Sequence, residues 1–432
     1  MREKLKSFLL VLLSLSAAAL FGLNLLLALD NSRFARVRRT LGLTDERGAS
    51  VVIADESAVL TPARLGVLGP GGLYLAAGTA ADELLGETLP ILSEALGSVS
   101  RIEAIRQQQF LDRLEGQGIY CSFTYPVPFF LLQYWWTGEL GLADQQAASA
   151  MVLTVEDGRV ELAFYDGAQE RFYLAETAAG YQRLSALCAR YDSPNAFFAC
   201  QSDGWQMLPL WEPVWIGEVW YPSYAVTALD FTQEGAISKE ILSAFSVNPY
   251  LAKVYKTTEG DVVYVEGRTA LQFSRDGSVA YTSQDEQGLH LDLREGLSER
   301  ELRAYAAARS RALLQDVCSA ASTRMSLSVA RSTVDERGVV TVAFEQAAGG
   351  AFVTGEDGYA AVVTVENGAV TGIRMRLLAL TQLQDVKLLP YRLASSLLPE
   401  KCDGVFVRYG SGDGRLTPGL YVMKGGASRG ME

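Results

Sequence analysis

The sequence contains very little histidine, and this scarcity excludes several classes of catalytic site. His290 is the only histidine in the 432 residues. A Ser-His-Asp or Cys-His site would therefore have to use it. Asp292 lies nearby in the sequence, but a metal ion needs three or four convergent ligands, which this pair does not supply. We therefore predict no catalytic residue, no metal site and no cofactor.

Two glycine-rich stretches resemble catalytic motifs but lack what those motifs need. The glycines between residues 66 and 72 are not followed by the Lys-Ser/Thr pair of a phosphate-binding loop. Residues 426–430 match G-x-S-x-G, yet that motif requires a helix after it, and almost no chain remains. We interpret the first stretch as turn-rich and expect the tail GGASRGME to be disordered.

Cysteine is also scarce, and its spacing excludes the common thiol motifs. The five cysteines are widely spaced and form no CxxC, so zinc-finger and thioredoxin-type sites are not expected. Cys188 and Cys200 could pair across a turn, but free buried thiols are the favoured interpretation. No cysteine closely follows the apolar residues 8–29, which excludes a lipid-modified N-terminus.

The chain has no excess of basic residues. Its formal net charge is −12, and an acidic protein does not hold a phosphate backbone by charge. Nucleic acid is therefore excluded as an expected partner. Hydrophobic content of 49% and charged content of 20% are typical of ordered globular protein.

What the sequence does contain is a long uncharged apolar stretch, FLLVLLSLSAAALFGLNLLLAL, at residues 8–29. As a helix it would span roughly 33 Å, the thickness of a bilayer core. The alternatives are a cleaved signal peptide, for which the stretch is too long and lacks a cleavage pattern, and a buried soluble helix. We favour a retained transmembrane helix, and the acidic body favours a cytoplasmic N-terminus with the body outside the cell.

One face of this helix combines small and polar residues. Small residues at a spacing of four let another helix approach closely, and an amide at membrane depth seeks a hydrogen-bond partner. The alternative is a generic anchor in which these residues are incidental. The predicted partner-binding face consists of Ser14, Ala17, Ala18, Phe21, Gly22 and Asn24.

The body is long enough for two or three domains of the α+β class, built from helices and antiparallel sheets. We expect a cytoplasmic tail at 1–7, the transmembrane helix at 8–29 and a juxtamembrane segment at 30–50. An N-terminal domain then covers 51–234, a central helix-plus-sheet domain 235–297, a C-terminal helix-plus-sheet domain 298–425, and a tail 426–432.

Apolar periodicity and turn residues predict the individual elements. The expected helices are 80–96, 101–116, 178–189, 238–246, 298–319 and 390–398. The expected strands are 51–54, 72–75, 119–125, which Pro126 and Pro128 should end, an antiparallel unit over 151–174, then 254–256, 262–266, 271–274, 280–283, 325–329, 339–346, 360–366, 369–377, 405–409 and 420–424. Asp157-Gly158 and Asn367-Gly368 are predicted hairpin turns, and Ser298 with Glu301 predicts a capping box.

Four tryptophans gather within a short segment, and they permit two interpretations. Trp205, Trp211, Trp215 and Trp220 could form a stacking platform for sugars. Tryptophan is equally common in domain interfaces and irregular cores, and we favour this structural interpretation.

Three stretches resemble the YycH/YycI regulatory proteins of Gram-positive bacteria. IYCSFTYPVPFFLL resembles a segment of the first YycH domain, and FSVNPYLAKVYKTTEGDVVYVEGRTALQFSRDGSVAYTS resembles a later turn-and-strand segment. VAFEQAAGGAFVTGEDG, VTVENGAVTGI and LYVMK resemble the C-terminal domain that YycH shares with YycI. The layout of one N-terminal helix followed by a large outer body is also similar.

The resemblance implies a function without catalysis. These proteins modulate the sensor histidine kinase WalK/YycG, which controls cell-wall metabolism, and they associate with each other. The expected function is therefore that of a membrane-anchored regulator with a sensor kinase and a YycI-like protein as partners. The alternative is a cell-wall-associated glycan-binding module or hydrolase that uses the tryptophan-rich segment.

Overall fold

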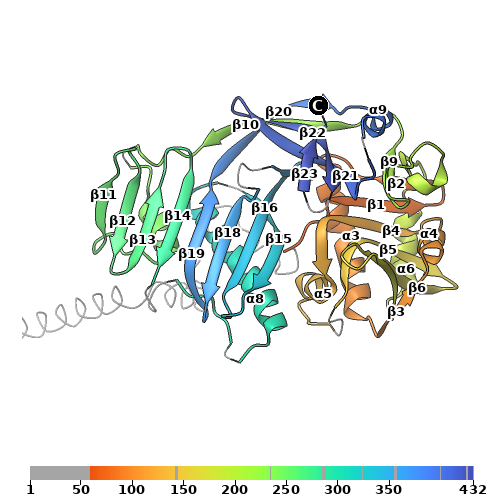
Figure 1. The fold of residues 1–432 in the computed structure, drawn as a ribbon, viewed down its shortest axis with the longest axis horizontal. Helices are drawn as coiled ribbons and strands as arrows, with labels where there is room; N and C mark the ends of the chain where they lie inside the picture. The colour runs from red at the N-terminus through yellow and green to blue at the C-terminus, as the bar shows by residue number, and fades with distance from the viewer. Residues whose placement is uncertain are drawn as a thin grey trace, which may run out of the picture. The chain divides into compact units, whose positions relative to one another are not determined.

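The computed structural model of the chain describes residues 59–141, 145–233, 235–284, 289–294, 296–323, 325–354, 358–398, 400–424 and 427–431. These residues belong to one compact unit, Ala54–Glu432. They form an α+β structure with two large sheets (Figure 1). The predicted fold class is confirmed at this level, whereas the boundaries between domains stay predictions.

The first sheet has nine strands in the order β3-β7-β6-β5-β4-β1-β2-β8-β9. All of its described pairings are antiparallel. Its strands are β1 (Arg64–Gly69), β2 (Gly72–Leu75), β3 (Arg101–Ile105), β4 (Gly118–Pro128), β5 (Ala147–Glu156), β6 (Arg159–Asp166), β7 (Arg171–Glu176), β8 (Ala196–Phe198) and β9 (Pro213–Trp215).

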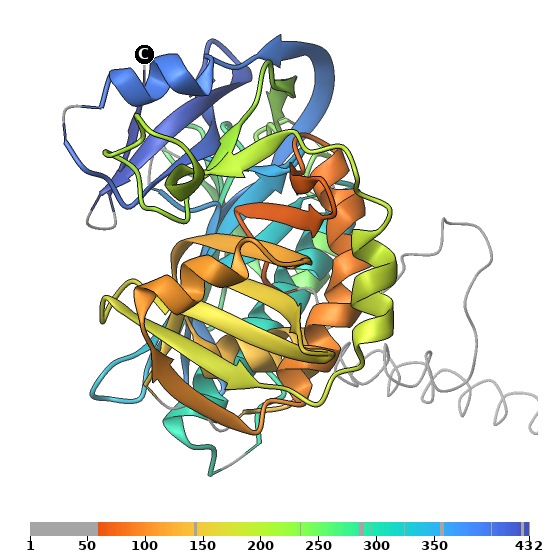
Figure 2. The ribbon, with the colours of Figure 1, turned by 90° about the vertical axis from the view of Figure 1, so that its right-hand side faces the viewer.

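Helices cover both faces of the first sheet because its strands are apolar on both sides. Ile119 and Cys121 of β4 share a core with α3, α5 and α6, while Tyr120 faces the opposite core with α4. In Figure 2 the orange α3 and the yellow-green α6 lie along the same face. The helices are α3 (Ala80–Gly97), α4 (Gln107–Arg113), α5 (Phe129–Thr137) and α6 (Tyr181–Cys188), and a short 3-10 turn, η2, covers Ala199–Gln201.

The second sheet has 14 strands, whose main order is β11-β12-β13-β14-β19-β18-β16-β17-β21-β22-β10-β20. β17 and β21 pair in parallel, and the other described pairings of this sheet are antiparallel. Its strands are β10 (Trp220–Ala228), β11 (Lys253–Lys256), β12 (Val262–Glu266), β13 (Thr269–Phe273), β14 (Ser278–Ser283), β15 (Ser326–Val334), β16 (Val340–Ala348), β17 (Ala351–Val353), β18 (Ala361–Glu366), β19 (Ala369–Arg376), β20 (Leu378–Lys387), β21 (Gly404–Gly412), β22 (Arg415–Lys424) and β23 (Ala427–Gly430).

Two helices of this half cover one face of the second sheet. Leu271, Phe273 and Ile373 share a core with buried residues of α7 (Lys239–Ala244) and α8 (Glu299–Ala320). α9 (Tyr391–Ser396) packs with β21 and β22 in the other core. Each of the two cores contains residues from both sheets, so the sheets are joined by continuous apolar packing.

Most predicted elements of the described chain are confirmed. The helix at 80–96 corresponds to α3, and the helix at 298–319 corresponds to α8 with its Ser298–Glu301 capping box. Asp157 and Asn367 have positive φ, as both predicted hairpins require. The predicted strand at 51–54 lies outside the described residues.

Four local predictions differ from the structure, three of them because of strand pairing outside the local segment. Residues 64–69 are not a turn-rich piece but the buried strand β1, which pairs with β4. Residues 101–116 divide into β3 and α4, because β3 pairs with β7. β4 continues past Tyr125, through Pro126 and across a register shift, and ends at Pro128, the second of the two prolines expected to end it. The tail is not disordered throughout, since Ala427–Gly430 pairs with β22.

Candidate functional site

The predicted partner-binding face lies outside the described residues. Ser14, Ala17, Ala18, Phe21, Gly22 and Asn24 all precede residue 59, the first residue that the structure describes. Among the helices that the structure does describe, none is both long and apolar enough to cross a bilayer. The membrane-helix contact therefore stays a prediction from the sequence.

His290 lies at the edge of a strand and not in a cluster of ligands. It forms an isolated antiparallel bridge with Ala369, the first residue of β19. Within the described residues, no group of three or more His, Cys, Asp or Glu side chains is placed to hold a metal ion.

The five cysteines are all free thiols. Cys188 is buried in α6, whereas Cys200 is exposed in the turn after β8. Burial raises the pKa of Cys188 to about 11 and the pKa values of Cys318 and Cys402 to about 12. Because the thiolate is the reactive form, these buried thiols are structural.

The tryptophan-rich segment is used mainly for packing. The Trp211 ring lies 4.2 Å from the ring of Tyr165 and 5.3 Å from that of Phe172, measured between centroids. Trp215 is buried against Tyr391 of α9. Trp220 is half exposed at the start of β10. The arrangement favours the structural interpretation over a continuous sugar platform.

A buried ion pair joins three segments that are far apart in the sequence. Arg64 of β1 donates to Glu212 at 2.6 Å, and both side chains are 3% exposed. Arg64 also donates to the carbonyl oxygen of Val405 in β21. The backbone N–H of Val405 and the hydroxyl of Tyr391 donate to the same carboxylate at 2.7 and 2.9 Å. The network thus ties the first sheet to β21 and α9.

The charges in this network stabilise each other. Burial, the largest single effect, would lower the pKa of Arg64, but the Glu212 carboxylate together with the nearby Tyr391 and Tyr120 outweighs it, so the pKa is raised. Burial and the same carboxylate raise the pKa of Tyr391 well above its ordinary value, and its hydroxyl stays protonated as a donor. The ring of Phe406 lies 4.2 Å from the Arg64 guanidinium carbon and covers it with an aromatic face.

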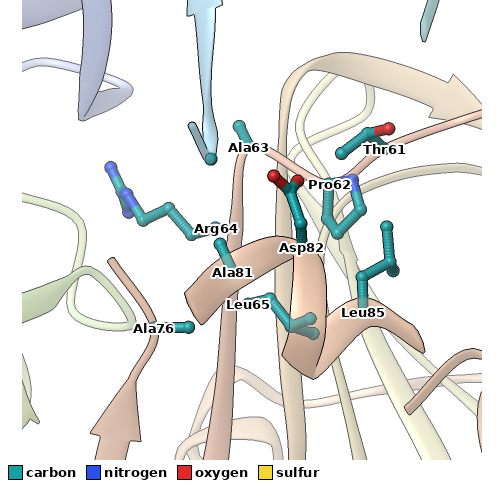
Figure 3. Close-up of a pocket in the computed structure, with 10 residues that line it drawn as sticks. Thr61, Pro62, Ala63, Arg64, Leu65, Ala76, Ala81, Asp82 and Leu85 are labelled. Carbon is teal, nitrogen blue, oxygen red and sulfur yellow. The ribbon is translucent and has the colours of Figure 1, made fainter. Parts of the chain in front are cut away.

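A small cavity lies beside this network, as Figure 3 shows. Arg64 lines the cavity with its stem, while its guanidinium points away from Asp82 and Leu85 (Figure 3). The volume is about 20 Å³, which holds about one water molecule. The cavity is therefore a packing feature and is too small for a substrate.

A second buried ion pair lies between β16 and β21. Arg408 donates to Glu345 at 2.5 Å and to the hydroxyl of Thr354 at 3.2 Å. Burial raises the pKa of Glu345 despite the opposing effect of Arg408. Both side chains are 3% exposed, so this pair also fixes the position of β21 within the sheet.

A larger cleft lies next to this pair, on the sheet face that α7 and α8 leave open. Its volume is about 660 Å³, within the range of small-ligand sites. Ala280, Arg374 and Val362 are adjacent across β14, β19 and β18 and form part of its floor. Its described lining contains neither histidine nor cysteine.

Sequence reasoning did not find these buried pairs. Arg64 and Glu212 are separated by 148 positions, and Arg408 and Glu345 by 63. The only local signal was a charged residue inside an apolar strand, as in RLGVLG of β1. A charged residue in an apolar strand needs a partner of opposite charge when it is buried, but the sequence does not show which residue that partner is.

The fold places the protein among α+β structures with large, predominantly antiparallel sheets. It is similar to the crystal structure of YycH from Bacillus subtilis, with a TM-score of 0.54, 12% sequence identity, and coverage of 87% of this chain and 96% of that chain. No model of a known protein family and no curated protein matches the sequence. The similarity concerns the fold, and at that level it agrees with the resemblance seen in the sequence.

Proposed function

We propose that the protein is a membrane-anchored, extracytoplasmic regulator of a sensor histidine kinase in a two-component system that controls cell-wall metabolism. The observation that carries the proposal is the YycH-like fold of the body, extending over most of the chain. The apolar stretch at residues 8–29 adds a single membrane anchor. The N-terminus is cytoplasmic and the body is outside.

The proposed mechanism uses protein contacts and no chemical reaction. The helix face containing Ala18 and Gly22 packs on the membrane helices of the kinase, because small residues allow close approach. The outer body binds a YycI-like partner. When binding of the partner favours one arrangement of the membrane helices, the kinase shifts toward the corresponding state. The size of the shift is set by the difference in affinity for the two states.

The experiment enlarges the small residues of the helix face in the full-length chain. Ala18→Leu with Gly22→Leu should reduce co-purification of the kinase from membranes by about tenfold, a change equivalent to ~1.4 kcal/mol, and should change kinase autophosphorylation. Ser16→Leu is the control, since Ser16 lies on the side of an ideal helix away from both Ala18 and Gly22. Unchanged kinase binding and signalling in the first variant would rule out this contact.

A further inference from the structure

The edge of the second sheet carries the most concentrated exposed apolar surface of the described chain. β11 is the terminal strand and, within that part of the chain, pairs only with β12 (Figure 1). Just before it and within it, Tyr250 is 79% exposed, Leu251 68%, Val254 53% and Tyr255 52%. Apolar groups clustered at a sheet edge mark a site of strand pairing or docking. We name these four residues and β11 the β11 edge.

The segment before β11 is held in place by its own hydrogen bonds. Glu266 accepts from the backbone N–H of Asn248 at 2.7 Å, and the Asn248 side chain accepts from Tyr250 N–H at 2.9 Å. Lys239 of α7 donates to the Tyr250 hydroxyl at 2.9 Å and lies 5.0 Å from the centre of its ring. The exposed Tyr250 ring is therefore held by these contacts, which lowers the entropy cost of binding.

Cations flank the apolar residues of this edge. Lys253 and Lys256 are the first and last residues of β11, and both are exposed. Glu266 is engaged with Asn248, and Glu259 lies beyond the strand in the turn to β12. In a chain of net charge −12, this edge presents lysine–apolar–apolar–lysine, and it complements a strand with carboxylates at both ends.

The same pattern disfavours a second copy of the chain as the occupant. An antiparallel pairing of two β11 strands over all four residues would place Lys253 opposite Lys256 of the other copy, twice. Like charges directly opposite each other in a sheet are destabilising. Lysine on an edge strand is also a known protection against self-association.

We infer that the β11 edge binds an extended segment of another extracytoplasmic protein, with the pattern acidic–apolar–apolar–acidic, as an added strand. The carboxylates lie opposite Lys253 and Lys256, and the apolar pair lies opposite Val254 and Tyr255. Main-chain hydrogen bonds supply affinity and the side chains supply selectivity. The inference deepens the proposed function, on which it rests only for the location of the partner outside the cell.

The test is photo-crosslinking of the full-length chain in its native membrane, with p-benzoylphenylalanine replacing Tyr255. We expect a crosslink to an extended partner segment that has the acidic–apolar–apolar–acidic pattern. Lys253→Glu with Lys256→Glu should reduce its yield by about tenfold or more, since each cross-strand charge pair turns from attractive to repulsive. Lys401→Glu with Lys424→Glu, also exposed lysines, should leave the yield within about twofold.

Two further measurements test whether the crosslink depends on the β11 edge and whether the variants fold normally. The same probe at Leu397, which is 53% exposed in another part of the chain, should not capture that segment. Thermal unfolding should be the same in both lysine variants, which shows that folding is not the cause. A crosslink to a second copy, to lipid or to a segment without the acidic pattern, or no crosslink at all, would overturn the inference. If the wild-type chain gives this crosslink but no kinase co-purifies with it, the proposed function alone would be removed.

Discussion

At the scale of single residues, the protein depends on charges that are buried in complementary pairs. Removing a charge from water is costly unless a partner and additional hydrogen bonds replace the lost solvation. Glu212 receives three donors, from Arg64, Tyr391 and Val405. The Glu212 carboxylate keeps all its hydrogen bonds only while the segments that carry these three donors are in place. The stability of this pair therefore depends on assembly of the whole body.

Replacing Arg64 by methionine should therefore destabilise the protein strongly. We expect Arg64→Met to lower the free energy of unfolding by about 3–5 kcal/mol, because it leaves Glu212 charged and buried. Lys424→Met is the matched control. Lys424 and Glu400 form an exposed pair, and its loss should cost less than about 1 kcal/mol. Urea unfolding measures both changes.

The double variant tests the cause of that effect. Arg64→Met combined with Glu212→Gln removes the unpaired charge but keeps an acceptor for Tyr391 and Val405. It should recover part of the loss, which gives a favourable coupling between the two substitutions. Strictly additive losses would show that the charge of Glu212 is not responsible.

At the scale of elements, α8 is the best-defined helix because local and tertiary signals agree. Ser298 begins it with a capping box, in which Glu301 accepts from the Ser298 N–H at 2.8 Å and from its hydroxyl at 2.7 Å. Ala304, Ala307 and Leu314 then form its buried face. The helix also meets the first half of the chain, since the indole N–H of Trp135 donates to the carbonyl oxygen of Ala304.

Ser298→Ala should lower the free energy of unfolding by about 0.5–2 kcal/mol, since the first turn of α8 loses its cap. The hydrogen bonds of Ser298 lower the pKa of Glu301. A carboxyl group with a lowered pKa in the fold stabilises above its ordinary pKa, and this contribution is lost as the pH falls through the folded value. The difference between wild type and variant should therefore shrink below pH ~4.3.

Ser319→Ala provides the control at the other end of the same helix. The Ser319 hydroxyl bonds to the Gln315 carbonyl one turn earlier and caps nothing. Its loss should have little effect at any pH. Equal losses in the two variants, measured by urea unfolding at neutral and acidic pH, would contradict the capping argument.

At the scale of the whole molecule, residues from both sheets share each of the two cores. The second core combines Tyr120 and Phe198 of the first sheet with Val407 and Leu420 near the end of the chain. The first sheet therefore does not complete its packing until the C-terminal strands are present. We expect the described body to unfold as one cooperative unit.

A truncation after Asp403 tests this dependence. It removes β21, β22 and the Val405 partner of Arg64, so the first sheet should lose its protection against limited proteolysis as well. A truncation after Lys424, which removes β23 and its flanking residues but leaves β22 whole, should remain as resistant as the full chain. Survival of a protease-resistant first sheet in the shorter protein would show that the two halves fold independently.

Elements with a strong local signal were predictable, and those that depend on distant contacts were not. The Asn367-Gly368 turn and the Ser298 cap are encoded by neighbouring residues, and both occur as expected. β1 was mistaken for a turn-rich piece because glycine and proline surround it, whereas its pairing with β4 makes it a buried strand. β17 and β20 were also missed, and each pairs with a strand distant in the sequence, β21 and β10 respectively.

The same difference between local and distant signals applies to the two candidate sites. The length and composition of the apolar stretch at residues 8–29 predict a membrane helix, so the anchor and its face could be proposed from the sequence. The β11 edge contains ordinary strand residues, KVYK, and nothing local shows that the strand has a single neighbour in the described chain. Its exposure is a consequence of sheet order, which no local pattern specifies.

The sequence by itself determined the apolar stretch, the acidic balance of the chain, its α+β class and most turns and helix starts. These properties depend on composition or on residues within a few positions of each other. Three features depend instead on how the chain packs: which charges are buried together, which cores both sheets share, and which strand lies at the edge. These outcomes require segments as far apart as Arg64 and Val405, separated by 341 positions, to meet, and such meetings depend on the packing of the whole chain.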